Sequence, residues 1–250
     1  MTFTLKAAAR SHVGLVRRRN EDSFYAGQWL FAVADGLGGH VAGDIASTTV
    51  VEALQLHDRQ VDSASLPAAL GRAVNAANEA LHRKIEAAPD LTGMGSTLVA
   101  LMWAGTVATL ANVGDSRVYR RRDTGPGGSG IPQMIQITED HTYGNLVADA
   151  ASVPNLPERI ARFLDGRSDG RSPDITVKDL HTGDRFLLCS DGLSGVVPSD
   201  LVCDAIASDD DPDAVAERLI TLAIEHGGLD NVTVVVIDVV ELADLREGSA

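Results

Sequence analysis

The chain has few residues that could cross-link it or pack as aromatic rings. Its 250 residues include only two cysteines, Cys189 and Cys203, which form no Cys-x-x-Cys pair. Two isolated thiols predict a reduced, cytoplasmic protein rather than a disulfide framework. Aromatic residues make up 4% of the sequence, whereas hydrophobic residues of all kinds make up 44%. We therefore expect Val, Ala, Leu and Ile to fill the core.

Basic residues are also scarce. Lys and Arg number 21 against 35 Asp and Glu, which gives a formal net charge of −14. Nucleic-acid binding relies on a basic footprint, so this balance argues against a nucleic-acid partner. The first ten residues lack the apolar core of a signal peptide.

A membrane span is not expected either, although residues 93–114 carry no charge. The segment is long enough to resemble a transmembrane helix. It contains several hydroxyl and amide side chains, and Ala104-Gly105 interrupts it. Two buried strands joined by a tight turn, Ser96–Trp103 and Thr106–Val113, explain this pattern better.

Apolar runs and helical repeats alternate in blocks along the rest of the chain. Runs typical of buried strands occupy 29–34, 97–103, 107–113, 117–121, 134–137, 185–190 and 232–240. Helical spacing is found over 42–56, 66–85, 201–208 and 213–226. Helices in two blocks with paired strands between them predict an α+β layered fold. We expect a single domain over 1–246, followed by a short tail over 247–250.

One long stretch, 145–173, is irregular and contains Pro154, Pro157, Gly166 and Gly170. Long irregular segments within compact domains are often lids or recognition loops.

Two apolar runs end in the same way. Phe31-Ala-Val-Ala runs into Asp35-Gly36, and Phe186-Leu-Leu-Cys-Ser runs into Asp191-Gly192. Two strands that each present Asp-Gly at the C-terminal end suggest that two carboxylates meet at one edge of the core. Carboxylates gathered in this way repel one another unless protons or cations neutralise them, and hard divalent metals are the usual answer.

Three further short segments place acidic residues in similar settings. They are Asn20-Glu21-Asp22, Asn112-Val-Gly-Asp115-Ser and Leu229-Asp230-Asn231. Each of them alone is more often a simple turn. The recurrence of carboxylates next to apolar strands and glycine weakens that simple interpretation.

Together and in this order, the segments resemble the bacterial branch of the PP2C (PPM) family of metal-dependent Ser/Thr protein phosphatases. The resemblance runs from about Ser11 to Asp238. The motifs that carry it are Asn-Glu-Asp, Ala-Asp-Gly-x-Gly-Gly-His, Gly-Ser-Thr, Asn-Val-Gly-Asp-Ser-Arg, Glu-Asp-His, Ser-Asp-Gly-Leu and Asp-Asn-Val-Thr. It implies a four-layer αββα sandwich, in which two antiparallel sheets are flanked by helices and the metals lie at one end.

The resemblance also implies a centre of two Mn²⁺ or Mg²⁺ ions. Asp35 corresponds to the ligand that bridges both ions, and the carbonyl of Gly36 corresponds to a ligand of the second ion. Asp191 and Asp230 correspond to ligands of the first. Asp115 matches a residue that helps Asp191 to hold a third, weaker ion in bacterial members.

Other site residues follow from the same resemblance. Asp22 and Glu21 match an element that contacts metal-bound water. Arg17 matches the arginine that binds the substrate phosphate, which suits its planar guanidinium. His40 is the candidate general acid, by analogy with the family histidine after the Asp-Gly turn. A structural histidine at this position, with a metal-bound water as the proton donor, is the alternative.

The reaction implied is hydrolysis of phosphoserine and phosphothreonine by attack of a metal-bridging hydroxide. Phosphorylated proteins, a Ser/Thr kinase and its targets, are then the expected partners of a monomeric cytoplasmic enzyme. Two alternatives stay open. One is a catalytically weak regulator that binds phosphoproteins, and the other is a phosphatase of small phosphoesters. His141 is expected to be structural, and Asp140 to support the site without binding metal.

Overall fold

The computed structural model describes residues 2–38, 42–123, 132–167 and 172–242. The strands are β1 (Phe3–His12), β2 (Asp22–Ala26), β3 (Leu30–Leu37), β4 (Gly95–Ser96), β5 (Leu98–Ala104), β6 (Val107–Val113), β7 (Arg117–Asp123), β8 (Pro132–Gln136), β9 (Asp174–Asp179), β10 (Arg185–Cys189) and β11 (Val232–Glu241). The helices are α1 (Gly43–Gln55), α2 (Leu66–Ala87), α3 (Tyr143–Leu146), α4 (Asp191–Ser194), α5 (Ser199–Ala207) and α6 (Pro212–Glu225).

The strands form two antiparallel sheets. The first sheet has the order β1-β11-β10-β7-β8. The second has the order β2-β3-β5-β6-β9, and the short strand β4 pairs with the end of β3. The first and last strands among the described residues lie side by side, with Phe3 opposite Glu241 and His12 opposite Val232. The N-terminal strand therefore forms one edge of the first sheet.

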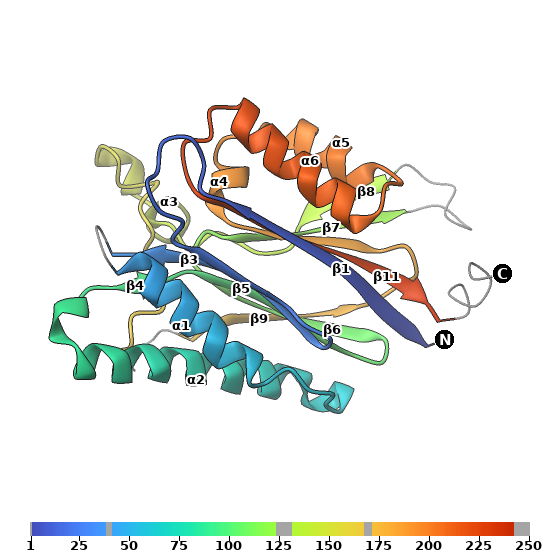
Figure 1. Ribbon diagram of the computed structural model, residues 1–250, viewed down its shortest axis with the longest axis horizontal. Helices are drawn as coiled ribbons and strands as arrows, with labels where there is room; N and C mark the ends of the chain where they lie inside the picture. Colours follow the sequence, from blue (N-terminus) through green and yellow to red (C-terminus); the bar gives the residue numbers. More distant parts are fainter. Residues whose placement is uncertain (1, 39–41, 124–131, 168–171, 243–250) are drawn as a thin grey trace.

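The layers are stacked in the order helix, sheet, sheet, helix (Figure 1). Helices α1 and α2 cover the outer face of the second sheet, and α5 and α6 cover the outer face of the first. Three apolar clusters fill the spaces between the four layers. This is the αββα sandwich expected from the sequence, and the α+β prediction is confirmed.

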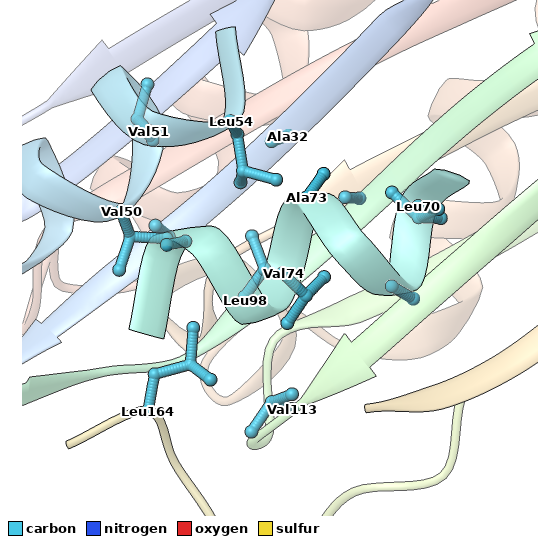
Figure 2. Packing of buried hydrophobic residues seen from close by; sticks show 14 of the residues in the cluster. Ala32, Val50, Val51, Leu54, Leu70, Ala73, Val74, Leu98, Val113 and Leu164 are labelled. Atoms are coloured by element: carbon cyan, nitrogen blue, oxygen red, sulfur yellow. The ribbon is translucent and has the colours of Figure 1, made fainter. Parts of the chain in front are cut away.

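Aliphatic side chains fill the space under α1 and α2. Figure 2 shows Val50 and Leu54 of α1 and Val74 of α2 above the strand residues Leu98 and Val113. The apolar positions of α2 recur at helical spacing, and Pro67 lies in its first turn, where a missing N–H costs nothing. Between the sheets, large side chains such as Phe31, Leu101 and Phe186 are almost completely buried. The scarcity of aromatic residues is thus met by close packing of branched aliphatic groups.

Most predicted elements occur within one or two residues of their predicted bounds. The uncharged segment forms β5 and β6, joined at Ala104-Gly105, where Gly105 has φ +60°. Within the described ranges, every helix is too short or too polar to span a lipid bilayer. The single domain over 1–246 stays a prediction, because its last four residues and the tail 247–250 lie outside the described residues.

Apart from the two-residue strand β4, three strands were missing from the sequence prediction. Strand β1 contains charged residues among its apolar ones, β2 has five residues, and β9 is exposed at alternate positions. All three lie at sheet edges, where one side of the strand has no neighbour and the apolar signal is weak. The irregular stretch 145–173 contains the end of α3 and a single 3₁₀ turn, 150–152, in its described part.

Candidate metal centre

Sheet topology brings the predicted acidic residues to one end of the sandwich. Asp35 lies near the C-terminal end of β3, and Asp22 of β2 is directly opposite it in the ladder. Asp191 follows β10, whereas Asp230 precedes β11. Because β10 and β11 are antiparallel, the end of one and the start of the other lie at the same edge. Figure 1 shows this end on the left, where α4 and the β3–β4 pair lie.

Asp115 lies at the same end of the sandwich because of the direction of strand β6. It follows β6, which is antiparallel to β5, and β5 is antiparallel to β3. Strands β3 and β6 therefore point the same way, and their C-terminal ends share one edge. The five predicted aspartates, Asp22, Asp35, Asp115, Asp191 and Asp230, all interact electrostatically.

Burial and mutual repulsion raise the pKa values of four of these carboxyl groups, those of Asp22, Asp35, Asp115 and Asp191. The pKa of Asp35 lies well above its ordinary value, first because the group is desolvated and then because of the charges on Asp22, Asp191 and Asp115. Desolvation also raises the pKa of Asp22 to about 7, although hydrogen bonds from Thr233 and Ser190 oppose the rise. Without cations, the site is therefore partly protonated at neutral pH.

Asp115 and Asp191 behave in the same way. Desolvation and the charge of Asp191 raise the pKa of Asp115 to about 7. The pKa of Asp191 is raised by desolvation and by Asp230, while a hydrogen bond with Asp35 and the charge of Arg17 act against the rise. The cluster thus needs positive charge, and protons supply it when metal does not.

Three of these carboxylates have an oxygen that is buried and unpartnered. Within the part of the chain that the structure describes, Oδ1 of Asp22, of Asp115 and of Asp191 accepts no hydrogen bond. Buried carboxylate oxygens are normally paired, and leaving one unpaired is costly. Carboxylate oxygens are also the ligands that Mg²⁺ and Mn²⁺ prefer. The donor set therefore fits hard divalent cations.

The carboxylates do not form a closed cage. Among the described residues, no three His, Cys, Asp or Glu side chains gather tightly enough to hold an ion unaided. Mg²⁺ is commonly held by one or two carboxylates and keeps several waters. The open arrangement is consistent with that mode of binding.

Gly36 occupies a position that only glycine fits. A Cβ atom at residue 36 would collide with the carbonyl oxygen of Gly43 and lie 2.7 Å from the carbonyl oxygen of Glu21. The backbone N–H of Gly36 donates to that Glu21 carbonyl at 3.1 Å. The glycine thus lets the start of α1 and the Asn20-Glu21-Asp22 segment close around the end of β3.

Thr97 fixes the backbone of Asp35 from the other side. Its N–H donates to the carbonyl of Asp35 at 2.8 Å, and its Oγ1 accepts from the N–H of Asp35 at 3.1 Å. The same hydroxyl lies 2.7 Å from Oγ of Ser116, next to Asp115. One threonine therefore links the backbone of one predicted ligand to the neighbour of another.

Arg17 already has a partner in the site. Its Nη2 donates to Oδ2 of Asp230 at 2.6 Å, and this bond is the main reason why the pKa of Arg17 is raised. The predicted phosphate-binding arginine and a predicted metal ligand are thus joined as an ion pair. The contact neutralises Asp230 in the absence of cations, and both side chains remain partly exposed.

Asn231 lies at the site, although the sequence analysis assigned it no role of its own. Its Oδ1 accepts from the N–H of Glu21 at 2.7 Å, and its Nδ2 donates to the carbonyls of Val13 and Arg19 at 2.9 and 2.8 Å. The buried amide thus holds the loop that carries Arg17 against the start of β11. Its place directly after Asp230, within the Asp-Asn-Val-Thr motif, was the sequence signal for it.

Ser190 was also missed. Its Oγ donates to Oδ2 of Asp22 at 2.8 Å and accepts from the N–H of Thr233 at 2.9 Å. This hydroxyl joins the start of β2 to β10 and β11, and so links the two sheets at the site. It is the residue before Asp191, and that adjacency could have identified it.

Of the two histidines singled out in the sequence, only His141 belongs to the described residues. His40 lies outside the described residues, so its role stays a prediction. His141 is buried, accepts from the N–H of Gly114 at 3.0 Å through Nδ1, and lies 3.1 Å from Asp174 through Nε2. These contacts agree with the structural role expected for it. Asp140 forms a bidentate pair with Arg117, in keeping with a supporting position.

Comparison with known proteins gives a consistent result. The family model described as protein phosphatase 2C matches residues 16–223. The chain is 43% identical over 248 residues to the serine/threonine protein phosphatase PstP of Mycobacterium tuberculosis (strain ATCC 25618 / H37Rv), covering 96% of this chain and 46% of the relative. It is 32% identical over 252 residues to the serine/threonine phosphatase stp of Listeria monocytogenes serovar 1/2a, covering 94% of this chain and 96% of that protein.

A solved structure resembles the whole fold. The catalytic domain of PstP, crystallised in complex with 2 manganese ions, has a TM-score of 0.85, and the alignment covers 96% of this chain and 100% of that one. The chain spans about half the length of the mycobacterial relative as a whole.

Proposed function

The chain belongs to the protein phosphatase 2C family, and from that premise we propose that it is a metal-dependent phosphatase of phosphoserine and phosphothreonine in proteins. The observation that carries the proposal is the group of buried aspartates at the sheet ends, whose pKa values are raised by burial and by one another. A cluster of this kind, placed beside an arginine, suits cations that bind a phosphate. Relatives that match nearly the full chain are named Ser/Thr phosphatases.

The cations are Mn²⁺ or Mg²⁺. Asp35, the carbonyl of Gly36, Asp191 and Asp230 would hold two of them, and Asp115 with Asp191 would hold a third, weaker one. Unpartnered oxygens on Asp115 and Asp191 support this assignment. Asp22 and Glu21 would contact water bound to these cations. The chemistry that such cations would supply when bound is a water of lowered pKa, which can act as a nucleophile near neutral pH.

The chain's own residues orient the phosphate. Arg17 uses Nη2 for Asp230, and its planar guanidinium carries further N–H groups that can meet two phosphate oxygens. The leaving serine or threonine oxygen needs a proton, and His40 is the proposed donor. The backbone of Asp35, fixed by Thr97 on one side and by the tight packing at Gly36 on the other, keeps the carboxylate in place.

The proposed partners are phosphorylated proteins, among them a Ser/Thr kinase and its targets. We propose that the protein acts as a monomer in the cytoplasm. The two cysteines are free in the structure, and one of them is buried. Free thiols are typical of reduced compartments and so support this localisation.

The test combines metal binding with turnover. The full chain is freed of metal with EDTA, titrated with Mn²⁺ in a calorimeter, and assayed for release of phosphate from a phosphothreonine peptide and from an aryl phosphate. We expect negligible turnover in EDTA and recovery on addition of Mn²⁺ or Mg²⁺. Full turnover in EDTA would contradict the metal assignment. Tight binding of the phosphopeptide without turnover would favour a catalytically weak regulator that binds phosphoproteins. Turnover of the aryl phosphate alone would favour a phosphatase of small phosphoesters.

A further inference from the structure

Three exposed apolar side chains lie beside the proposed phosphate arginine. Leu15 is 65% exposed, Val16 63% and Leu229 56%. None of them belongs to the three apolar clusters formed by the described residues. Single exposed apolar residues need no explanation, but three in one place point to an interaction. We call these three residues the apolar rim.

Backbone contacts bring the parts of the rim together. The N–H of Leu15 donates to the carbonyl of Gly228 at 2.7 Å. Gly14, at φ +82°, is packed so closely that a Cβ there would collide with the carbonyl oxygen of Asp230. The segment 14–16 therefore runs along 228–230. Two residues of the rim, Val16 and Leu229, directly precede the ion pair of Arg17 and Asp230.

The rim is held rigidly. The side chain of Asn231, which is 5% exposed, bonds to both ends of the loop, at Val13 and at Arg19, and also to Glu21. The loop that carries Leu15 and Val16 is thus anchored on both sides of its exposed residues. A surface ordered in advance loses less entropy when a ligand binds, which favours a role in recognition.

We propose that the apolar rim binds an apolar side chain adjacent to the phosphorylated residue of a peptide substrate. This inference rests on the proposed phosphatase function. An extended peptide advances by about 3.3 Å per residue. When the phosphate is held at Arg17, the residues that flank the phosphoresidue therefore lie over Val16 and Leu229. The rim therefore sets a preference for sequence around the phosphoresidue, while Arg17 and the cations bind the phosphate that all substrates share.

A second copy of the chain is a less suitable occupant. Stable protein interfaces bury about 1,200–2,000 Å² in total, which requires some twenty residues on each side. Three side chains are enough for one or two residues of a peptide but not for a dimer. The acidic net charge of −14 also makes two copies repel each other.

The experiment compares two phosphothreonine peptides that differ only in the residues flanking the phosphothreonine, leucine in one and glycine in the other. Val16→Ser and Leu229→Ser are assayed with both peptides and with an aryl phosphate, in Mn²⁺. Leu56→Ser is the matched control, because Leu56 is 80% exposed and lies at the end of α1. Thermal melting verifies that each variant is folded, and sedimentation gives its oligomeric state.

We expect the unmodified protein to prefer the leucine peptide about tenfold in kcat/KM, the scale set by small apolar contacts in a binding pocket. Val16→Ser and Leu229→Ser should reduce that preference severalfold through KM, relative to the aryl phosphate, whereas Leu56→Ser should keep it. Equal turnover of both peptides by the unmodified protein, or an unchanged preference in both rim variants, would overturn the proposal that the rim binds a flanking apolar side chain.

The remaining outcomes separate the rim from the function beneath it. A dimer that dissociates in Leu229→Ser would assign the surface to a second copy and also overturn the proposal. Absence of turnover for all three substrates in Mn²⁺ would instead refute the phosphatase function, and the rim with it. Turnover of the aryl phosphate and equal turnover of the two peptides would refute only the proposed role of the rim in peptide binding.

Discussion

The interior between the sheets and the carboxylate end are built from the same strands, yet they follow opposite rules. Strand β3 contributes Phe31 and Val33 to the apolar interior and then Asp35 to the site. Strand β10 contributes Phe186 and Leu188, and Asp191 follows at its end. The interior gains stability from every group that it buries. The carboxylate end buries like charges, which oppose folding until protons or cations neutralise them.

This contrast teaches where folding and function diverge. An apolar side chain removed from the interior should reduce the stability of the protein. A carboxylate removed from the site should abolish activity but stabilise the protein without metal. The predictions below test that separation, in order of decreasing effect.

The largest effect is expected for Asp191→Asn. A neutral amide binds a hard divalent cation poorly, so turnover should fall by about a thousandfold or more, in the range seen when a group that stabilises a transition state is lost. Without metal the same variant should be more stable, by about 1 kcal/mol, because one like charge is gone. Assays of phosphate release in Mn²⁺ and urea titrations in EDTA measure both quantities.

Asp62→Asn is the control, because Asp62 is exposed and remote from the cluster in the chain. It should change neither quantity. Undiminished turnover in Asp191→Asn would contradict its place as a ligand. Loss of stability in EDTA would show that the buried charges do not oppose folding.

Leu101→Ala tests the other half of the comparison. Leu101 lies in the middle of β5, a strand that contains no carboxylate, and it is fully buried between the sheets. Its truncation should lower the free energy of unfolding by about 2–5 kcal/mol, through lost burial and a cavity. The folded fraction should keep its KM for an aryl phosphate. A large change in KM with little loss of stability would break the separation.

Arg17→Ala should have a moderate effect on binding. Loss of a charged hydrogen bond to phosphate should raise KM about tenfold to hundredfold and lower kcat less. Steady-state kinetics at saturating Mn²⁺ measure the two constants separately, and Arg18→Ala is a neighbouring control. A decrease in kcat alone would place the arginine in transition-state stabilisation instead.

The smallest effect concerns pH. The unfolded chain releases the proton of Asp22 near its ordinary pKa of 3.8, whereas burial raises the folded-state pKa to about 7. Between these values the folded state binds more protons, so the stability of the metal-free protein falls as pH rises. The slope for one such group is about 1.4 kcal/mol per pH unit.

Urea titrations in EDTA at pH 5, 6 and 7 measure the total slope, and Asp22→Asn should reduce it by about the contribution of one group, because the raised pKa values of Asp35, Asp115 and Asp191 also contribute. The variant also corrects for other titrating groups, such as His57, whose pKa is lowered by desolvation. An identical slope in both proteins would contradict the raised pKa. With Mn²⁺ in excess the slope should be smaller, because cations replace the protons.

The success of sequence reasoning differed between the interior and the edges. Strands β5, β6, β10 and β11 were predictable because they are buried on both faces and read as continuous apolar runs. Strands β1 and β9 were missed, because an edge strand tolerates polar residues and its pairing depends on a distant partner. In β1 that partner is the last strand of the chain.

The site shows the same division. The carboxylates at the ends of β3 and β10 could be expected to meet, because each comes at the end of a buried apolar run and directly precedes a glycine. The pairing of Arg17 with Asp230 joins residues 213 positions apart. The three bonds of Asn231 span similar separations. No local pattern encodes such contacts, since they depend on how β1 and β11 are aligned.

The sequence by itself determined the chemistry and the layers of this protein. Apolar runs, helical repeats and Asp-Gly ends are local patterns, and hydrophobic burial converts them into strands, helices and a cluster of carboxylates. Only the tertiary structure decided which groups neutralise one another. It paired Arg17 with Asp230, left three carboxylate oxygens without hydrogen-bond partners in the described part of the chain, and placed the apolar rim beside the arginine. The reason is physical: electrostatic and hydrogen-bond energies depend on distances of a few ångströms between residues that are far apart in the chain.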